Sequence, residues 1–398
     1  MQNGTTIRYD SGVLKHASAE RKLDFLLLME DYSHMYTTAI KGDAMLAALP
    51  YAACAREVFA RQIFYGDAYI DALTSQGLHA DQVVPMCFPL QHKWAAEHHV
   101  WFPPAWTSKR PFRWYWTRRR NRKSPEGWAL SQVLIDQLKR FRPKYLWVFS
   151  GIPVSQYDIA NWRLYTERII LWWSATLWPG YPYEHFDLIL SGIPALVEQF
   201  RTQGIQAAYL AHAFDRRILQ RVPVASERIP RVAFVGSLTS DHADRIAFLD
   251  ALARRVEIDF YGRGVEYLPS DSPLRTRYRG PAWGDDLYSV YGSYLVVFHK
   301  NIGVAGTSAS AKRLFEATGM GACVIAETSD DMPSLFQPEH EIVTYSSFDD
   351  CVEKIASLLA HPQVALQIGQ RAQQRTLTEH TYARRVQQIL HYIEQSGF

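Results

Sequence analysis

The sequence predicts an α/β protein made of two doubly wound domains, each with a parallel sheet covered by helices. Short apolar runs alternate with longer amphipathic stretches, the alternation starts again after the segment 222–230, and 398 residues exceed one ordinary hydrophobic core. The first cycle predicts strands at 23–29, 145–149, 186–191 and 207–210, and helices at 52–69 and 128–141.

The second cycle follows the same order along the chain. It predicts strands at 232–236, 257–261, 294–299, 322–326 and 342–345, and helices at 243–254, 311–318, 348–359, 362–379 and 383–395. Ligands of doubly wound sheets bind beyond the carboxyl ends of the strands. The loops that follow these strands are therefore the places to search for functional side chains.

Composition excludes several classes of protein. The net charge of only +3 argues against a nucleic-acid-binding protein. The four cysteines lack zinc or redox spacing, which predicts buried free thiols in a reducing compartment. The polar N-terminus lacks a signal-peptide pattern, and no apolar run approaches the roughly 20 residues of a membrane span, so we expect a soluble, cytoplasmic protein.

Several familiar motifs fail on inspection. The G-x-G of residues 262–264 lacks the third glycine of a dinucleotide fingerprint, and no Walker A sequence occurs. The stretch GTSAS at 306–310 lacks the last glycine of a nucleophile elbow. His98 and His99 have no partners at metal-ligand spacing, so we predict no metal site.

The stretch TSASAKRLFEATGMGA at 307–322 predicts an anion site at a helix start. Lys312 and Arg313 lie at the positive end of the helix dipole, where each cation costs about 0.3–1 kcal/mol unless an anion is bound. Ser310 can cap the helix, and both basic side chains can donate to phosphate. Glu316 follows one turn later, and its carboxylate suits a ribose diol. The alternative is a solvated intrahelical salt bridge of little energetic value.

Other loops of the second cycle offer further contacts for a bound anion. Gly236 and Ser237 end its first strand, where a glycine lets the backbone approach a phosphate and a serine adds a hydroxyl; the alternative is a plain turn. Arg263 and Lys300 also follow strand ends. Both are therefore candidates for electrostatic contacts with a bound anion.

At this point the chain resembles a known family. The residues 313–362 resemble the C-terminal, group 1-type domain of GT-B-fold nucleotide-sugar glycosyltransferases, and are most similar to the spore-maturation-like (CgeB-like) branch. VAFVGSL at 232–238 and EHTYARRVQQIL at 379–390 agree, and the first-domain segment 64–98 is a looser match. The resemblance implies two Rossmann-like domains that face a cleft. It gives an acceptor-side domain at 1–215, a donor-binding domain at 216–380 and a C-terminal helix at 381–398 that packs back on the first domain.

The resemblance also implies a function. It implies metal-independent transfer of a sugar from a nucleoside diphosphate sugar to a hydroxyl of a glycan, lipid-linked saccharide or protein, with no cofactor besides this donor substrate. Glu316 matches the ribose ligand of the family, and Lys312 and Arg313 would face the diphosphate. Ser308 stands where the fuller E-x7-E pattern has its first glutamate, so sugar and stereochemistry stay open. A nucleotide-sugar epimerase and a catalytically silent nucleotide-binding module are the alternatives.

Three first-domain segments bear on the acceptor. Asp31 and His34, in the loop after the first strand, are candidate general bases, against ordinary loop polarity. The aromatic segment 162–183 is interpreted as a packed core helix for Trp172 and Trp173, or as an acceptor pocket. The basic aromatic segment 109–123 has three interpretations: a solvated loop, peripheral contact with an anionic inner membrane face near a lipid-linked acceptor, or nucleic-acid binding, which we disfavour.

Overall fold

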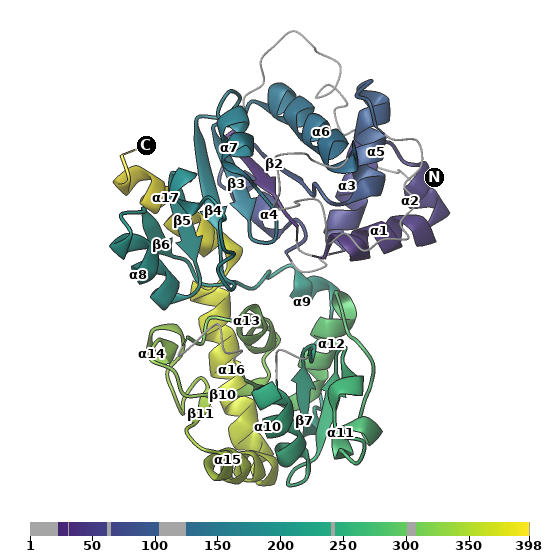
Figure 1. The fold of residues 1–398 in the computed structure, drawn as a ribbon. Coiled ribbons are helices and arrows are strands. Elements are labelled where there is room, and N and C mark those ends of the chain that lie inside the picture. Colours follow the sequence, from purple (N-terminus) through teal and green to yellow (C-terminus); the bar gives the residue numbers. More distant parts are fainter. Residues whose placement is uncertain are drawn as a thin grey trace, which may run out of the picture.

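The computed structural model describes residues 23–30, 32–61, 65–102, 125–239, 243–300 and 308–397. Asp31 and the segment 109–123 lie outside these residues, so the predictions made for them are not addressed by the structure. The described residues form two α/β domains, one above the other in Figure 1, which meet near the short helix α9 (Ile218–Arg221).

The first domain contains a six-stranded parallel sheet with the strand order β2-β1-β3-β4-β5-β6. Its strands are β1 (Phe25–Leu28), β2 (Ala80–Val83), β3 (Tyr145–Phe149), β4 (Arg168–Trp172), β5 (Leu188–Ser191) and β6 (Ala207–Tyr209). Along β3, Trp147 belongs to one buried cluster and its neighbours Leu146 and Val148 to another. Successive side chains of a strand point to opposite faces, so both faces of this sheet are covered.

The helices of the first domain surround this sheet. They are α1 (Ser33–Gly42), α2 (Ala44–Ala48), α3 (Tyr51–Ala60), α4 (Ala68–Thr74), α5 (Phe88–Glu97), α6 (Pro125–Phe141), α7 (Gln156–Trp162) and α8 (Pro194–Thr202), with a 3₁₀ turn η2 (Tyr183–His185). The single helix expected at 52–69 is wrong. Its residues form α3 and α4 instead, and Gly66, at a φ of 54°, lies between them.

The structure also corrects the interpretation of the aromatic segment 162–183 as a core helix. Trp172 is the last residue of β4, which pairs with β3 and β5 in the centre of the sheet. A short apolar run that is buried on both sides cannot be assigned to strand or helix by periodicity alone. The edge strand β2 was not expected either, because Asp81 and Gln82 interrupt its apolar pattern.

The second domain contains a five-stranded parallel sheet with the order β11-β10-β9-β7-β8. Its strands are β7 (Ile229–Val235), β8 (Ile258–Tyr261), β9 (Tyr294–His299), β10 (Cys323–Glu327) and β11 (Val343–Tyr345). Its helices are α10 (Ala243–Ala253), α11 (Pro273–Thr276), α12 (Asp285–Ser293), α13 (Lys312–Gly319), α14 (Met332–Leu335), α15 (Phe348–Ala360) and α16 (Pro362–Glu379), with a 3₁₀ turn η4 (Val265–Tyr267). Two doubly wound parallel sheets confirm the predicted fold class.

The last helix, α17 (Tyr382–Gln395), leaves the second domain and lies beside the first, as the yellow ribbon in Figure 1 shows. Val386, Ile389 and Ile393 join the buried cluster that contains Phe25 of β1. Arg385 donates hydrogen bonds from Nε to the carbonyl of Ala211 at 2.8 Å and to that of His212 at 3.0 Å. The chain therefore crosses between the domains twice, once through the linker that contains α9 and once before α17.

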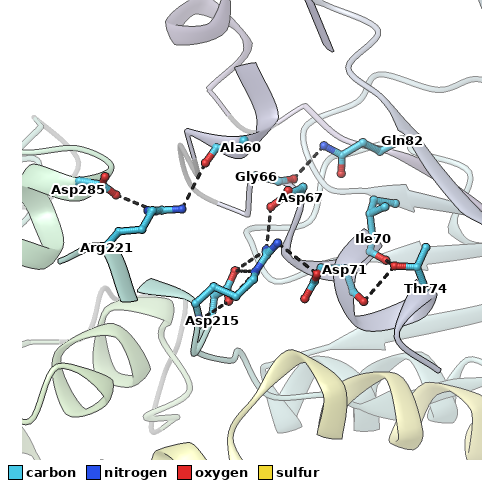
Figure 2. Close-up of polar contacts among 11 residues, drawn as sticks. Ala60, Gly66, Asp67, Ile70, Asp71, Thr74, Gln82, Asp215, Arg221 and Asp285 are labelled. Carbon is cyan, nitrogen blue, oxygen red and sulfur yellow. Dashed lines mark hydrogen bonds and ion pairs between the residues drawn. The ribbon is translucent and has the colours of Figure 1, made fainter. Parts of the chain in front are cut away.

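Two arginines of the linker make polar contacts to the domains on either side, in the region that Figure 2 shows. Arg221 donates to the carbonyl of Ala60 in the first domain at 3.4 Å and to Asp285 in the second at 2.7 Å. Arg217 Nη2 lies 2.6 Å from Asp215 and 2.7 Å from Asp67. The linker is therefore held by charged contacts on both of its sides.

Two predictions on composition can be compared with the described residues. All four cysteines are free and buried, which confirms the prediction of free thiols. Within the described ranges, no helix has the length and apolar character needed to span a membrane.

Candidate functional site

A cavity of about 480 Å³ lies between the two domains. Trp172 at the end of β4 and Ser150 just after β3 contribute to it from the first domain, and Val235 and Tyr261 at the ends of β7 and β8 contribute from the second. Both sheets thus present their carboxyl ends to the same space. This is the place where doubly wound sheets bind ligands.

Most of the predicted donor residues line this cavity. They are Gly236, Ser237, Ser310, Lys312, Arg313 and Glu316. Lys312 is the first residue of α13, so both basic side chains occupy the first helical turn. The amides of this turn and two cations therefore face the same cavity.

Lys312 and Glu316 form a buried ion pair within α13. The Nζ atom of Lys312 contacts Oε1 of Glu316, and only 6% and 5% of their side-chain surfaces are exposed. The hydroxyl of Tyr288 donates to the same carboxylate oxygen at 3.3 Å. The intrahelical salt bridge of the sequence-based alternative therefore forms, but it is buried in the wall of the cavity and not solvated.

Arg313 is fixed by the end of β7. Its Nη1 donates to the Val235 carbonyl at 2.7 Å, next to Gly236. A Cβ atom at Gly236 would lie 2.0 Å from this nitrogen. A side chain at this position would displace the guanidinium, which occupies the space of its Cβ atom.

Arg245 is a third basic residue of the cavity, which the sequence analysis missed. It lies in the first turn of α10, is 3% exposed, and donates from Nη2 to the carbonyl of Ser237 at 2.5 Å. Burial and the neighbouring Arg313 lower the pKa of Arg245 to about 9, so it stays cationic at neutral pH. The signal that drew attention to Lys312 and Arg313, basic residues in the first turn after a strand, would also have found Arg245.

The other predicted residues that the structure describes, Arg263, Lys300 and His34, lie outside the cavity lining. Arg263 lies 5.9 Å from the ring centre of Trp283, which itself lines the cavity. Lys300 forms an ion pair with Glu327 at 2.9 Å and is engaged away from the site. Burial and the nearby Arg263 lower the pKa of His34, which is not among the lining residues.

The first-domain wall contains residues that sequence reasoning did not select as ligands. The hydroxyl of Tyr65 lies 3.2 Å from Nδ1 of His212, and the ring of Trp172 meets the imidazole at 5.4 Å in an edge-on arrangement. Burial, Lys312 and Arg385 lower the pKa of His212 to about 3, so the ring is neutral. No local sequence pattern joins these residues, because Tyr65 and His212 are 147 positions apart.

Ser308 stabilises the loop that precedes α13. Its hydroxyl donates to Oδ2 of Asp331 at 2.7 Å, and the amide of Ala309 donates to Oδ1 of the same carboxylate at 2.7 Å. The hydroxyl of Ser310 accepts from the amide of His212 at 3.4 Å. In the part of the chain that the structure describes, no group of three or more His, Cys, Asp or Glu side chains is placed to hold a metal ion.

These features define a two-domain α/β protein with the GT-B fold. Residues 245–391 match the family model described as glycosyl transferase-like. A glycosyltransferase from Rickettsia africae ESF-5 superimposes with a TM-score of 0.55 and 10% identity over 94% of this chain and 98% of that one. Among the curated proteins compared, none matches this chain.

Two further solved structures share the fold. HepE from Anabaena in complex with UDP and glucose has a TM-score of 0.54 and 11% identity, over 94% of this chain and 100% of that one. Sucrose-phosphate synthase from Thermosynechococcus elongatus has a TM-score of 0.50 and 13% identity, over 67% of this chain and 77% of that one. At such low identities the similarity shows the fold.

Proposed function

We propose that this protein is a glycosyltransferase that moves a sugar from a nucleoside diphosphate sugar to a hydroxyl group of an acceptor. The observation that carries the proposal is the convergence of Arg245, Lys312 and Arg313 on one wall of the interdomain cavity. Two cations at the start of α13 and one at the start of α10 suit a diphosphate, because phosphate oxygens accept hydrogen bonds from guanidinium, ammonium and first-turn amide groups. The glycosyl transferase-like match at 245–391 includes all three residues.

In this proposal, each second-domain residue has a defined role. Arg245, Lys312 and Arg313 neutralise the negative charge that develops on the leaving nucleoside diphosphate. The main chain at Gly236 and Ser237 approaches the phosphates, and the first-turn amides of α13 donate to them. Glu316 accepts from the ribose hydroxyls while Lys312 and Tyr288 orient its carboxylate. These side chains replace a metal ion as the source of positive charge.

The acceptor enters from the first domain in this proposal. A glycan, a lipid-linked saccharide or a protein hydroxyl fits a wall formed by aromatic and hydroxyl side chains such as Trp172 and Ser174. Asp31 remains the proposed general base, and His34 is the weaker choice because it lies outside the cavity lining.

The basic segment 109–123 would hold a cytoplasmic enzyme at an anionic membrane surface. Flotation of the protein with anionic but not with neutral liposomes would support this last step.

The test is release of the nucleoside diphosphate. The purified chain is incubated with UDP-, GDP- and TDP-sugars, and free nucleotide is measured. We expect release from at least one donor, and loss of this release in Arg313→Met. Interconversion of donor sugars without release would identify an epimerase. Tight nucleotide binding without release from any donor would identify a silent module, an alternative that Ser308 favours because the family pattern has an acid there. Absence of both binding and release would refute the proposal.

A further inference from the structure

We infer that the transferred sugar is uncharged and lies against the paired side chains of His212 and Tyr65, so that donors bearing a uronic acid are rejected. This inference rests on the proposed function, since it assigns the sugar of the same donor. It goes further in naming a class of sugar and the residues that select it.

The charges of the cavity are distributed unequally between its two walls. Among the described lining residues, the four with formal charge, Arg245, Lys312, Arg313 and Glu316, all belong to the second domain. The described first-domain lining residues are aromatic, apolar or hydroxyl-bearing, apart from His212. A ligand with a charged half and a neutral half can therefore match both walls in one orientation only.

The two walls meet where the sugar of a bound donor would begin. The Ser310 hydroxyl, two residues before α13, accepts from the His212 amide at 3.4 Å. The Nζ atom of Lys312 lies 5.8 Å from the ring centre of Tyr65. A diphosphate at the first turn of α13 thus ends beside His212 and Tyr65. The group attached to its second phosphate, which is the sugar, is the next to contact them.

The imidazole of His212 is held in one place and in its neutral form. Tyr65 engages Nδ1, Trp172 packs against the ring, and Arg385 donates to the His212 carbonyl at 2.9 Å. Burial, with Lys312 and Arg385 nearby, lowers the pKa of His212 to about 3. The engagement of Nδ1 leaves Nε2 for a ligand. A neutral imidazole nitrogen donates or accepts one hydrogen bond, as a sugar hydroxyl also does.

A carboxylate at the same place would lack a partner. Lys312, whose Nζ lies 5.8 Å from the ring centre of Tyr65, already pairs with Glu316 and would be shared with the diphosphate. Binding of a sugar carboxylate would remove water from its charge, which no described residue of the first-domain wall can neutralise. Loss of hydration without a compensating pair disfavours binding, so the wall selects against acidic sugars.

Donor binding to the purified full-length chain tests the class of sugar. Calorimetric titration compares UDP, UDP-glucose and UDP-glucuronate, and in parallel GDP, GDP-mannose and GDP-mannuronate. For the nucleotide that binds, we expect the neutral sugar donor to have an affinity at least roughly tenfold higher than that of the corresponding uronate donor. The reason is that an unpaired charge is buried only when the uronate binds. A uronate that binds as tightly as the neutral sugar would overturn the inference.

The variant Tyr65→Phe tests the residues, with Tyr69→Phe as a matched control. The two rings are neighbours at 5.7 Å, but the buried Tyr69 hydroxyl has no hydrogen-bond partner among the described residues. In Tyr65→Phe, we expect the gain in affinity from UDP to UDP-glucose to fall by roughly 3–10-fold, with UDP affinity within about twofold of wild type. Tyr69→Phe should leave both unchanged.

The outcomes separate this inference from the proposed function. If UDP, GDP and TDP all fail to bind the wild-type chain, the proposed function fails. If a nucleoside diphosphate binds but Tyr65→Phe keeps the full gain from the sugar, only the role of the His212–Tyr65 pair fails. If Tyr65→Phe weakens UDP and UDP-glucose equally, Tyr65 has a structural role and the inference is also overturned.

Discussion

Arg313 Nη1 donates a 2.7 Å hydrogen bond to the Val235 carbonyl, and this contact joins the first turn of α13 to the end of β7. The two elements are 78 positions apart in sequence. Their junction places the guanidinium over Gly236, so a helix start and a strand end form a single surface. The geometry of the proposed diphosphate site therefore depends on a position that has no side chain.

The first prediction concerns Gly236→Ala. The new Cβ would lie 2.0 Å from Nη1 of Arg313, so the guanidinium must move while the backbone can stay. We expect affinity for UDP or GDP to fall roughly tenfold, because a charged hydrogen bond is worth about 1.5–3 kcal/mol. The free energy of unfolding should fall by only about 1 kcal/mol, at the low end for overpacking.

Gly42→Ala is the control for this substitution. No heavy atom lies within 4 Å of a Cβ built at Gly42, which is the last residue of α1. Nucleotide affinity, measured by calorimetry, should be unchanged in this variant. Wild-type affinity in Gly236→Ala would show that the position of Arg313 is unimportant for binding.

The second prediction separates the two roles of the Lys312–Glu316 pair. Glu316→Gln leaves the buried ammonium without its carboxylate, which should lower the free energy of unfolding by about 3–5 kcal/mol. The double variant Lys312→Met/Glu316→Gln removes both charges and should recover most of this loss in urea unfolding. Its affinity for nucleoside diphosphates should stay at least roughly tenfold below wild type. A stable double variant with wild-type affinity would reduce the pair to a structural element.

The third prediction assigns a binding role to Arg245. Arg245→Met removes a cation that faces the cavity and should weaken UDP or GDP binding by roughly tenfold or more. The weakening should be smaller at high ionic strength, because salt screens the charge in the wild type. Arg255, an exposed residue in the turn that follows α10, provides the control. Arg255→Met changes the net charge equally and should leave binding unchanged. Equal losses in both variants would point to a general effect of charge.

The sequence predicted elements whose signals are local. The strand at 145–149 has the same bounds as β3, because a central strand buried on both faces is one continuous apolar run. β4 has a similar run, but the run and its tryptophan suit a core helix equally well, and only pairing with β3 and β5 decides. A continuous apolar run was therefore not sufficient by itself to distinguish a buried strand from a buried helix.

The same distinction applies to the site. Lys312, Arg313 and Glu316 are found from sequence because they share one helical turn and its dipole. His212 and Tyr65 are 147 positions apart in sequence and contact each other only in the folded structure. Lys300 follows a strand end, like Arg263, but Glu327 at the end of the adjacent strand neutralises it. Contacts between distant segments leave no pattern that one sequence reveals.

The fourth prediction concerns acid stability through His380. Nδ1 of this histidine faces Nη2 of Arg385 at 2.9 Å and Nε2 faces the Leu335 carbonyl at 2.7 Å, so Nδ1 has to stay unprotonated. Burial and Arg385 lower its pKa from 6.5 to about 3. Between these values the unfolded chain binds a proton that the native chain does not, so stability falls as the pH decreases through this window. We expect this histidine to cost about 2 kcal/mol of unfolding free energy between pH 7 and pH 5.

Urea unfolding at pH 7 and pH 5 measures this cost. His380→Gln should be less stable than wild type at pH 7 but should lose less stability between the two pH values. His79→Gln, at a side chain that is 65% exposed, should keep the pH dependence of the wild type. An identical pH dependence in all three proteins would contradict the assignment to His380.

The fifth prediction compares Arg217 and Arg221, two arginines of the linker. Arg217 faces three carboxylates, at 2.6 Å from Asp215, 2.7 Å from Asp67 and 3.3 Å from Asp71. Arg217→Met would leave these carboxylates to repel one another. We expect a loss of about 1–3 kcal/mol in the free energy of unfolding, below the value for a fully buried pair because the side chain is 31% exposed. High salt should reduce the loss, since it screens the repulsion.

Arg221→Met is the matched variant, because Arg221 also joins the linker to its surroundings but, among the described residues, forms an ion pair with the exposed Asp285 alone (Figure 2). Exposed pairs contribute about 0–1 kcal/mol, so urea unfolding should barely change. A larger loss in Arg221→Met than in Arg217→Met would mean that the bridge between the domains, and not the cluster of carboxylates around Arg217, stabilises the linker. The difference between the two variants therefore decides which contact holds the two domains in the arrangement that forms the cavity.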